Sequence, residues 1–569
     1  MNIREAILKN RKHDISLVKD EADLRPLSGL ICGREVIAEL SEAVMSGRYV
    51  TVYGDYDADG IMAAYILCAS LSLLNPGKAG WFINDRFEDG YNMTTASVEK
   101  CLAEHPDTEL MITCDNGINA AEAVAFAMAK GVDVIVTDHH VQTRPLPAGC
   151  RALDERSLEQ VKADEAFGIL PEGFCGAELA RRVVRELFAT LGKDKEFREY
   201  LDGLYAYSAF ATIADHVPMN AANHYVGRRG LDIIAEGEGF WGVLKDEYLA
   251  ERGLRQLRID SSAIGFSYAP MINASSRMTG SADTAMRALM SANGAPGDDA
   301  KQAIRALIGL NEERKEVCAR DDMVAFDIIE KNGYDRDPFI LVCDPRLSEG
   351  VNGLTATHIT EKYKVPSAVL SPNRNDASVF KGSARSPEGF DLVRALTSHG
   401  ELIRAGGHPL AAGLSVSETD IETVRALLNR DAVGFRYEPV KKFDLVFSPE
   451  DLSVRLVNEI AEITRSLEPF GPGFEEPRIL VVGRARDIWE SAKKGTGKKV
   501  HAKFPLGRAA DGSFVDAVWW NHLDDAKAVF EPGKELGFKG GLGLNEFRGK
   551  VSLQITVTGI LSGNDLRSL

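Results

Sequence analysis

The sequence has no hydrophobic run long enough to span a membrane. Its longest apolar stretch, residues 61–74, contains two serines and leads into an Asn-Pro-Gly turn at 75–77. A membrane-spanning helix needs about 20 apolar residues, so no transmembrane segment is expected. The first five residues carry both signs of charge where a secretory peptide would have apolar residues. We therefore expect a cytoplasmic protein.

Cysteine occurs without the spacing of a metal or disulfide framework. The eight cysteines lie at positions 32, 68, 101, 114, 150, 175, 318 and 343, and no two of them form a Cys-x-x-Cys pair. This pattern excludes a zinc ribbon and a disulfide scaffold. The cysteines are expected to be reduced thiols, most of them buried.

An excess of basic charge is also absent. The 67 Lys and Arg residues are outnumbered by 84 Asp and Glu, so the net charge is −17 and the molecule as a whole repels polyanions. A local basic groove is still compatible with this charge, and carboxylates that bind metal would contribute to the acidic excess. At 569 residues and 44% hydrophobic content, the chain is long enough for three or four domains of ~150 residues.

Short apolar runs alternate with helical patterns in the first part of the chain. Strands are expected at 49–53, 110–113 and 132–137, with helices at 61–74 and 120–130. This alternation predicts βαβ units and a parallel sheet, which is an α/β fold. In such sheets, ligands bind at the carboxyl ends of the strands.

The remainder of the chain changes pattern twice. Residues 226–335 are rich in helix, and 300–331 could form one long connector. A smaller α/β domain follows and ends near 432, with expected elements at 339–342, 354–362 and 367–370. Beyond 438 the pattern alternates, which predicts a small antiparallel β-barrel with strands at 479–482, 514–520, 536–538 and 551–560.

Acidic residues and histidines follow the three predicted strands of the first domain, and one more aspartate follows the apolar segment 209–214. They are Asp55, Asp57, Asp59, Asp115, Asp138, His139, His140 and Asp215. Taken singly, these motifs fit a calcium loop, a β-turn or a helix cap. The calcium loop fails, because its twelfth position is Ile66 rather than Glu. Carboxylates with a few imidazoles suit divalent metals, and two close ions need a bridging carboxylate.

Several motifs together carry a family resemblance. They lie at residues 53–60, 115–117, 138–140, 214–218, 270–277, 381–386 and 406–413. With these motifs the sequence resembles the DHH phosphoesterase superfamily, and specifically the RecJ family of single-strand-specific 5′→3′ exonucleases. The resemblance covers most of the chain.

The resemblance implies two Mn²⁺ or Mg²⁺ ions as cofactors. One ion would be held by Asp59, Asp115, His139 and Asp215. The other would be held by Asp57, Asp115 and Asp55, with Asp115 as the bridge. His140 would lie close enough to donate a hydrogen bond to a phosphate oxygen or a metal-bound water. The implied catalytic residues are Asp57, Asp59, Asp115, Asp138, His139, His140 and Asp215.

The resemblance also implies residues that bind the substrate. Arg86 would contact phosphate near the 5′ end, and Tyr91 would stack on a base or narrow the entrance against duplex. The other implied substrate residues are Asn273, Arg277, Ser383, Arg385 and His408. Isolated arginines are more often surface ion pairs, so these assignments depend on the motifs that contain them.

The resemblance implies four domains, the last of them similar to an oligonucleotide-binding (OB) fold. Their expected ranges are 1–225 for the DHH domain, 226–335 for the helical connector, 336–432 for the DHH-associated domain and 438–569 for the OB-like domain. Residues 478–508 carry nine Lys or Arg against two acids, which makes them a candidate track for a DNA backbone. The aromatic residues of this region are expected mostly in the barrel core; they are Trp489, Phe504, Trp519 and Trp520.

Three positions depart from the family pattern. Tyr53 stands where many superfamily members carry a histidine ligand, and Asp55 would then substitute for it. Residues 154–156 replace an expected Asn-Pro turn, and residues 472–474 depart from a usual Gly-x-Gly-Asn pattern. The last two departures concern the conformation of loops rather than the metal site.

The leading hypothesis is a metal-dependent exonuclease that releases 5′-mononucleotides from single-stranded DNA in repair or recombination. A phosphodiesterase for short oligonucleotides or cyclic dinucleotides is a second reading, and an inactive RecJ-like scaffold protein is a third. The expected partner is single-stranded DNA, with single-strand-binding protein or a helicase as further candidates. A monomer without membrane contact is expected.

Overall fold

The structure, a computed structural model, describes residues 2–90, 92–167, 169–293, 296–437, 442–492, 499–547, 550–563 and 566. Tyr91 and the basic turn at 493–498 lie outside the described residues. Contacts divide the chain into two units: residues 18–217 with 225–438, and residues 1–17 with 218–224 and 439–569. The domain boundaries expected from the sequence stay predictions. Among the described residues, no helix is both long and apolar enough to cross a membrane.

A parallel sheet in the order β2-β1-β3-β4-β5 organises the first part of the larger unit. Its strands are β1 Val50–Gly54, β2 Ala79–Ile83, β3 Leu110–Cys114, β4 Asp133–Thr137 and β5 Arg151–Leu153. Every residue of β1 and β3 is buried, as expected of parallel strands covered on both faces. The three predicted strands are confirmed, whereas β2 and β5 were not predicted.

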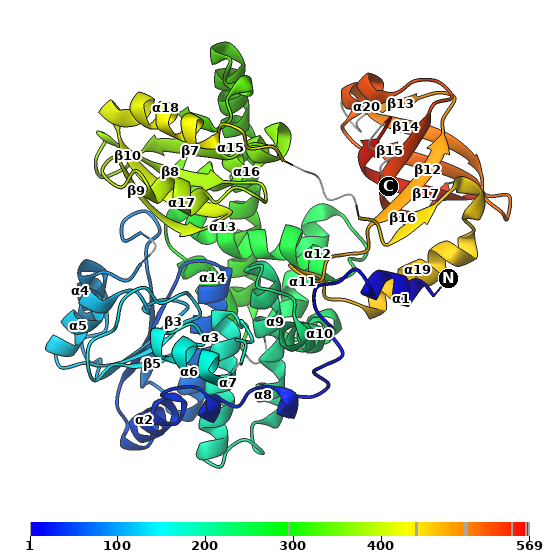
Figure 1. Cartoon of the computed structure of the whole chain (residues 1–569). Helices are drawn as coiled ribbons and strands as arrows, with labels where there is room; N and C mark the ends of the chain where they lie inside the picture. Colours follow the sequence, from blue (N-terminus) through cyan, green and yellow to red (C-terminus); the bar gives the residue numbers. More distant parts are fainter. Residues whose placement is uncertain are drawn as a thin grey trace. The chain divides into compact units, whose positions relative to one another are not determined.

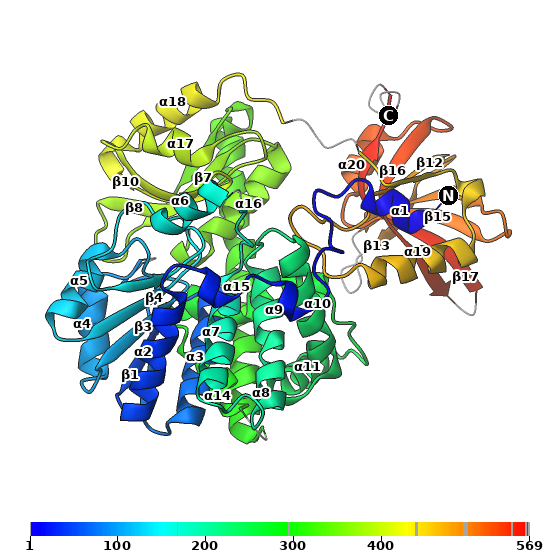
Figure 2. The ribbon, with the colours of Figure 1, turned by 60° about the horizontal axis from the view of Figure 1, so that its bottom comes forward.

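Helices cover both faces of this sheet (Figures 1 and 2). On one face, α4 Thr95–Glu104 and α5 Ala121–Ala129 pack on the sheet through an apolar core that includes Val98 and Val124. The other face is covered by α2 Gly33–Ser46, α3 Ala58–Leu74 and α7 Gly176–Thr190. The remaining helices of this region are α6 Leu158–Phe167, α8 Arg198–Gly203 and α9 Tyr205–Ala214. The predicted α/β fold is confirmed.

The predicted helical connector is present. Its helices are α10 Ala221–Glu236, α11 Gly239–Arg252, α12 Ser261–Ala263, α13 Ala269–Thr279, α14 Asp283–Ser291 and α15 Asp298–Asn332. Helix α15 is continuous over 35 residues and ends at Gly333, whose φ of 70° suits a left-handed C-cap. It packs against α11, α13 and α14 and also against α16 of the following domain.

A mixed sheet in the order β6-β7-β8-β10-β9 forms the second α/β domain. Its elements are β6 Ile340–Cys343, α16 Asn352–Tyr363, β7 Ser367–Pro372, β8 Val379–Arg385, α17 Leu392–Thr397, β9 Ile403–His408, β10 Ala411–Ser417 and α18 Ile421–Ala432. The prediction found β6, β7 and α16. It missed β8, β9 and β10, although two of the family motifs lie on them.

The C-terminal unit contains a seven-stranded sheet in the order β11-β12-β16-β17-β15-β14-β13. Its elements are β11 Leu445–Phe447, α19 Val454–Ser466, β12 Ile479–Arg484, β13 Trp489–Ala492, β14 Lys499–Arg508, β15 Phe514–Trp519, α20 Leu523–Val529, β16 Glu535–Phe547 and β17 Lys550–Leu561. The expectation of a wholly antiparallel arrangement is wrong, because β11 pairs with β12 and β15 with β17 in parallel.

The N-terminal segment belongs to this C-terminal unit. Helix α1 spans Ile3–Leu8, and the guanidinium of Arg11 donates two hydrogen bonds of 3.0 Å to the carboxylate of Asp444. Both side chains of this pair are at most 3% exposed. The backbone N–H of Lys12 also donates to Gly473 O, at 3.1 Å. The first residues of the chain are thus bound to residues more than 400 positions later.

Candidate metal centre

Two hydrogen bonds fix the junction between the loop after β1 and helix α3. The carboxylate of Asp57 is the N-cap of α3 and accepts hydrogen bonds from the backbone N–H groups of Asp59 and Gly60, at 3.0 and 3.2 Å. Asp55 is 2% exposed. Burial first, and then the neighbouring Asp57 charge, raise the pKa of Asp55 well above its usual value. The loop therefore holds closely spaced carboxylates at the carboxyl end of the sheet.

Asp115 follows β3 in a left-handed backbone conformation, with φ of 56°. Such a conformation is uncommon for a residue other than glycine and often marks a functional site. The start of α7 approaches closely here, because a Cβ on Gly176 would lie 2.7 Å from Asp115 Cβ. Burial, followed by the charges of Asp59 and Asp57, raises the pKa of Asp115 well above its usual value.

The N-terminus of α7 holds Asp59. The backbone N–H groups of Gly176 and Ala177 donate hydrogen bonds of 2.6 and 2.7 Å to its two carboxylate oxygens. Burial and the nearby Asp57 still raise the pKa of Asp59 to about 7. The sequence analysis missed this role of α7. A glycine directly before the amphipathic pattern at 177–188 is the signal that would have suggested a close approach.

His139 faces three of the predicted carboxylates. Its Nε2 lies 3.0 Å from Asp115 Oδ1, 3.6 Å from Asp59 Oδ2 and 3.8 Å from Asp215 Oδ2. Burial, followed by the charge of His140, lowers the pKa of His139 to about 3. A neutral imidazole with this orientation can offer the Nε2 lone pair to a metal.

Asp138 is a positioning residue for the two histidines. Its carboxylate accepts hydrogen bonds from the backbone N–H of Ile118, His139 and His140, at 2.7–3.2 Å. It also lies 2.7 Å from Nδ1 of His140. Burial alone would raise the pKa of Asp138 and lower that of His140. The hydrogen bond between Asp138 and His140 outweighs the effect of burial. The pKa of Asp138 is therefore lowered to about 2, and the pKa of His140 is raised to about 9.

The ligand atoms come together in three overlapping groups, each with atoms within 4.8 Å of one another. The groups are Asp55 with Asp57 and Asp115, Asp59 with His139 and Asp215, and Asp115 with His139 and His140. Asp215 completes the set from the C-cap of α9. Within the described residues, Oδ1 of Asp55 and Oδ1 of Asp115 are buried without a hydrogen-bond partner. Buried, repelling carboxylates with unpartnered oxygens fit two divalent cations.

Tyr53 does not belong to these groups. Its hydroxyl donates to Asn84 Oδ1 and lies 2.6 Å from Ser97 Oγ, and its ring packs 5.2 Å from that of Phe82. Tyr53 is thus part of the apolar core on the α4 and α5 side of the sheet. The metal group next to β1 contains Asp55, in agreement with the expected substitution.

Three arginines lie beside the acidic loop. The guanidinium of Arg86 is 4.9 Å from the ring centroid of Tyr56, the residue between Asp55 and Asp57. Burial, followed by the charges of Arg86 and Arg385, lowers the pKa of Arg277 to about 9. Among the described residues, Arg86, Arg277 and Arg385 form no ion pair with a carboxylate, and Arg277 and Arg385 donate to backbone carbonyl oxygens instead. A cluster of partly buried cations in which the pKa values of Arg277 and Arg385 are lowered favours an anionic ligand.

The second α/β domain contributes further polar groups to this cluster. A Cβ on Gly353 would lie 2.8 Å from Arg385 Nη2 and 3.3 Å from Ser383 Oγ, so both side chains lie against the first turn of α16. Arg277 Nη1 donates to Gly350 O at 3.3 Å, just before that helix. No side chain caps the N-terminus of α16, which leaves its N–H groups available for an anion.

Two further predicted residues are Asn273 and His408. Oδ1 of Asn273, on α13, is buried and has no hydrogen-bond partner among the described residues. The ring of His408, at the end of β9, stacks 6.2 Å from that of His140. Sequence reasoning missed Arg156, whose charge acts on His139, Asp215 and His408. The structure thus groups Arg86, Arg277, Arg385 and Ser383 and places His408 beside His140, whereas Tyr91 lies outside the described residues.

Some basic side chains of residues 478–508, in the C-terminal unit, form ion pairs with acidic residues. Arg484 pairs with Glu535 at 3.5 Å and Lys503 with Asp516 at 2.7 Å. The expectation that the aromatic residues lie mostly in the core is wrong for two of them. Phe504 is fully buried, but Trp489 is 55% and Trp520 is 46% exposed. The Lys503 ammonium lies 5.4 Å from the Trp489 ring, so an aromatic and basic surface exists here.

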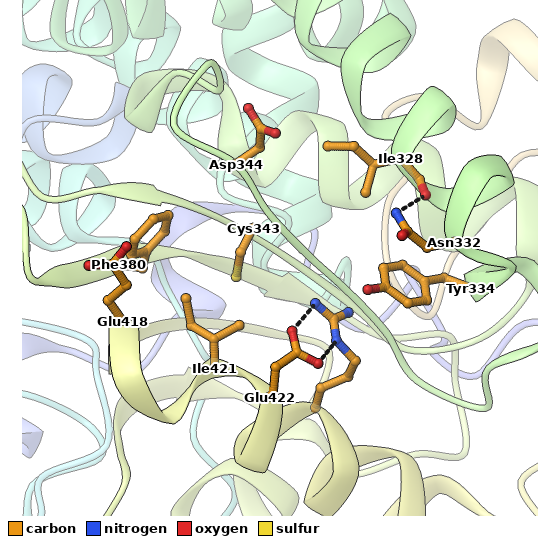
Figure 3. Close-up of a pocket in the computed structure, with 10 residues that line it drawn as sticks. Ile328, Asn332, Tyr334, Cys343, Asp344, Phe380, Glu418, Ile421 and Glu422 are labelled. Carbon is orange, nitrogen blue, oxygen red and sulfur yellow. Dashed lines mark hydrogen bonds and ion pairs between the residues drawn. The ribbon is translucent and has the colours of Figure 1, made fainter.

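A cavity of about 350 Å³ lies apart from the carboxylates, between α15, β6, β8 and α18. Figure 3 shows its lining, including Asn332, which donates a hydrogen bond to Ile328 O at 2.8 Å. Arg425, a cation in this lining, is already bound to Glu422 and to Leu341 O. The cavity shares no residue with the metal groups.

Comparison with known protein families covers three segments of the chain. Residues 49–207 match the family described as "DHH family, N-terminal domain", residues 337–433 match the "DHHA1 domain", and residues 443–559 match the "RecJ OB domain".

Curated relatives and a solved structure extend the likeness to nearly the whole chain. The single-stranded-DNA-specific exonuclease RecJ of Bacillus subtilis is 27% identical over 529 residues, which are 92% of this chain and 62% of that protein. The corresponding protein of Dickeya dadantii is 29% identical over 548 residues, 94% of this chain and 91% of that protein. A crystal structure of RecJ in complex with Mn²⁺ from Thermus thermophilus has a TM-score of 0.74 at 25% identity and covers 99% of this chain and 76% of its own.

Proposed function

Since the chain belongs to the RecJ family of the DHH phosphoesterases, we propose that it is a metal-dependent exonuclease that degrades single-stranded DNA from the 5′ end and releases 5′-mononucleotides. DNA repair and recombination are the processes in which it would act. The observation that carries the proposal is the convergence of carboxylates and imidazoles around Asp115, beside arginines without carboxylate partners.

Two Mn²⁺ or Mg²⁺ ions are proposed as cofactors. Asp59, Asp115, His139 and Asp215 would hold one ion, and Asp55, Asp57 and Asp115 the other. The grouping of these ligand atoms and the unpartnered oxygens of Asp55 and Asp115 support this assignment. When bound, the two cations would lower the pKa of a water, orient it and offset charge that develops on the phosphate.

The chain's own residues position this chemistry. The N–H groups of Gly176 and Ala177 fix both oxygens of Asp59. In the metal-free protein, the hydrogen bond with Asp138 raises the pKa of His140 to about 9, which favours its imidazolium form. An imidazolium next to the metal groups can donate a hydrogen bond to a phosphate oxygen.

The arginine cluster is proposed to bind the terminal phosphate. A terminal phosphate carries ~1.5–2 negative charges at pH 7, more than a bridging phosphodiester. Three guanidiniums, the Ser383 hydroxyl and the N-terminus of α16 suit that charge. Binding of the 5′-terminal phosphate would place the first phosphodiester bond at the carboxylates, which accounts for exonuclease action and for its direction.

The alternative substrates are favoured less. Short oligonucleotides or cyclic dinucleotides would not need the exposed Trp489 and Trp520 of the C-terminal unit, which offer stacking surfaces for a longer strand. An inactive scaffold would not need the full ligand set, all of which meets in the structure. Single-strand-binding protein and helicases stay candidate partners.

The test compares substrates in the presence of Mn²⁺. The substrates are a 5′-phosphorylated single strand of at least ~20 nucleotides, its duplex, a dinucleotide and a cyclic dinucleotide. We expect mononucleotides from the single strand and little product from the others. Internal and 5′ labels on the same strand report the direction, because 5′→3′ action releases the 5′ label first. A preference for the dinucleotide would contradict the proposal.

A matched pair of variants assigns the activity to this centre. Asp115→Asn removes a proposed ligand at the centre. Asp107→Asn makes the same change at an exposed residue eight positions earlier, which belongs to none of the metal groups. Activity should be lost in the first variant and retained in the second. Equal activity of both variants would place the reaction elsewhere.

A further inference from the structure

A second set of metal-ligating side chains lies where α15 packs against α16 (Figure 1). It consists of Cys318 and Asp322 on α15 and His358 on α16. Their ligand atoms lie within 4.8 Å of one another. None of these residues belongs to the carboxylate groups after the parallel sheet. Neither the proposed nuclease reaction nor the family motifs use them.

Helix geometry accounts for the arrangement. Cys318 and Asp322 are four residues apart, so they lie one turn apart on the same face of α15. Nδ1 of His358 lies 2.8 Å from Asp322 Oδ2. Cys318 is 5% exposed, and the side chains of Asp322 and His358 are 21% and 43% exposed. The set is thus rooted in the interface between the helices and open to solvent at His358.

One atom of the set is left without a partner. Oδ1 of Asp322 is buried and accepts no hydrogen bond from the described residues. An unpartnered buried carboxylate oxygen is costly, since it has lost water without replacement. A cation between Asp322 and its two neighbours would satisfy this oxygen.

The chemistry of the ligands selects the class of cation. Thiolate is a soft ligand and favours Zn²⁺ and similar ions, whereas Mn²⁺ and Mg²⁺ prefer oxygen ligands. Ligand atoms bound at ~2.0–2.3 Å to a tetrahedral zinc lie ~3.3–3.8 Å apart. The observed grouping within 4.8 Å needs only small side-chain shifts to reach that geometry. Three protein ligands leave a fourth position for water on the exposed side.

We propose that Cys318, Asp322 and His358 form a second metal site, of the Zn²⁺ class, that fastens α16 to the long helix α15. The site is separate from the Mn²⁺ or Mg²⁺ centre in both position and ligand type. Its structural consequence concerns α16, whose first turn carries Gly353 against Arg385 and Ser383. A metal that holds the middle of α16 would also hold that turn in place.

A metal-free arrangement is the competing explanation. In the absence of metal, hydrogen bonds with Asp322 and Cys318 raise the pKa of His358 to about 10. A protonated His358 would then join the two helices by itself. The two explanations differ in whether a thiolate–metal bond forms, and this bond has its own spectroscopic signature.

The experiment titrates the chelator-treated full chain with Co²⁺, a spectroscopic substitute for Zn²⁺. A cobalt–thiolate bond gives charge-transfer absorption in the near ultraviolet, which oxygen and nitrogen ligands do not give. We expect this absorption to saturate with a single cobalt ion and to disappear when Zn²⁺ is added. Its absence at saturating Co²⁺ in the folded protein would overturn the proposal.

Three variants locate the bond. Cys318→Ser and His358→Asn should each abolish the absorption and weaken binding by more than the ~10–100-fold that loss of an outer partner costs. Cys343→Ser alters another partly buried cysteine and should leave the absorption unchanged. Absorption that survives in either of the first two variants would overturn the proposal.

Thermal unfolding provides a second readout that does not depend on nuclease activity. Zn²⁺ also suits the carboxylates and imidazole of the other centre, so it should raise the Tm of every variant, but by less in His358→Asn than in the parent chain. His358 is the more exposed ligand, so this variant decides the question if Cys318→Ser fails to fold. An equal rise in Tm for His358→Asn would overturn the proposal.

Discussion

Asp115 lies between the two proposed ion positions, in a left-handed backbone and with a buried oxygen that has no hydrogen-bond partner. We expect Asp115→Asn to lower the rate of DNA hydrolysis by at least ~10²–10³-fold, because it removes the carboxylate shared by both ligand groups.

The same variant should raise the stability of the metal-free protein by ~1–4 kcal/mol, since one of several repelling buried charges is lost. Steady-state rates and melting in EDTA measure the two effects. A variant that is both active and less stable would contradict this account.

Asp138 acts through His140, so its replacement should change the pH profile of the reaction. In Asp138→Asn the pKa of His140 should fall from about 9 toward or below its usual value of 6.5. The imidazolium would then be present at about pH 6 and largely absent at about pH 8.5. The activity relative to the parent chain should therefore decrease as the pH rises between these values. A constant ratio across this range would show that the charge on His140 has no part in the reaction.

At the residue scale, the sequence predicted which acidic residues and histidines gather at one site but not how they are held. Acidic residues after successive strands could be placed at one sheet edge, because parallel strands share their carboxyl ends. The bonds from Gly176 and Ala177 to Asp59 could not be predicted, since they join positions more than 100 residues apart. The charge of Arg156 was missed for the same reason. Tertiary contact, rather than local pattern, decides such roles.

Helix α16 carries His358 of the second proposed metal site and, in its first turn, Gly353 against Arg385. In Gly353→Ala the new Cβ would lie 2.8 Å from Arg385 Nη2, so this arginine must move. We expect KM for a 5′-phosphorylated strand to rise about tenfold, which corresponds to ~1.4 kcal/mol of lost binding, with a smaller change for a strand with a 5′-hydroxyl.

The matched control for this variant is Gly309→Ala. Gly309 lies inside α15, and its Cβ would meet no atom within 4 Å. It should leave KM unchanged and stabilise the protein by ~0.5–1 kcal/mol, because alanine is a better helix former than glycine. Kinetics on both strands and urea unfolding measure these effects. Equal KM values for the two variants would contradict the proposed role of α16.

At the element scale, long and strongly periodic segments were predicted and short ones were not. The pattern at 300–331 gave α15 almost to its ends. Strands β2 and β5 were missed, because β2 is an edge strand with alternating burial and β5 has three residues. In the second domain, the glycines at 382, 406 and 407 obscure the strand pattern of β8 and β9. Glycine is rare in strand interiors unless another chain segment approaches closely, which is the case at Gly382 and Gly407.

The stability of the whole molecule should depend on pH and metal together. In the metal-free state the pKa of Asp59 is raised to about 7 by burial and by Asp57. A carboxyl with a raised pKa in the folded state favours folding below its unfolded pKa, and this contribution is lost as the pH rises through about 7. In EDTA, the Tm should therefore fall as the pH rises from about 4 to about 7. Mn²⁺ should restore more stability at the higher pH, because ions then need not displace protons. A metal-free Tm that rises over this range would contradict the buried-carboxylate account.

At the scale of the molecule, part of the acidic excess behind the net charge of −17 gathers in the metal groups, whereas residues 478–508 of the C-terminal unit are locally basic. Composition alone predicted neither of these. The exposure of Trp489 and Trp520 also could not be predicted, because strand alternation assigns faces only after the register is known. The parallel pairs β11–β12 and β15–β17 of the seven-stranded sheet could not be predicted for the same reason, because strand pairing is a long-range property.

The buried pair of Arg11 and Asp444 has a consequence for the order of synthesis. Arg11 in residues 1–17 is synthesised more than 400 residues before Asp444, the partner that buries it. At ~5–20 residues per second, the N-terminal segment waits roughly 20–85 s for this partner. The larger unit is complete in sequence before this wait ends. Packing of residues 1–17 is therefore expected to follow synthesis of Asp444, so the C-terminal unit would be completed only after the larger unit has been made.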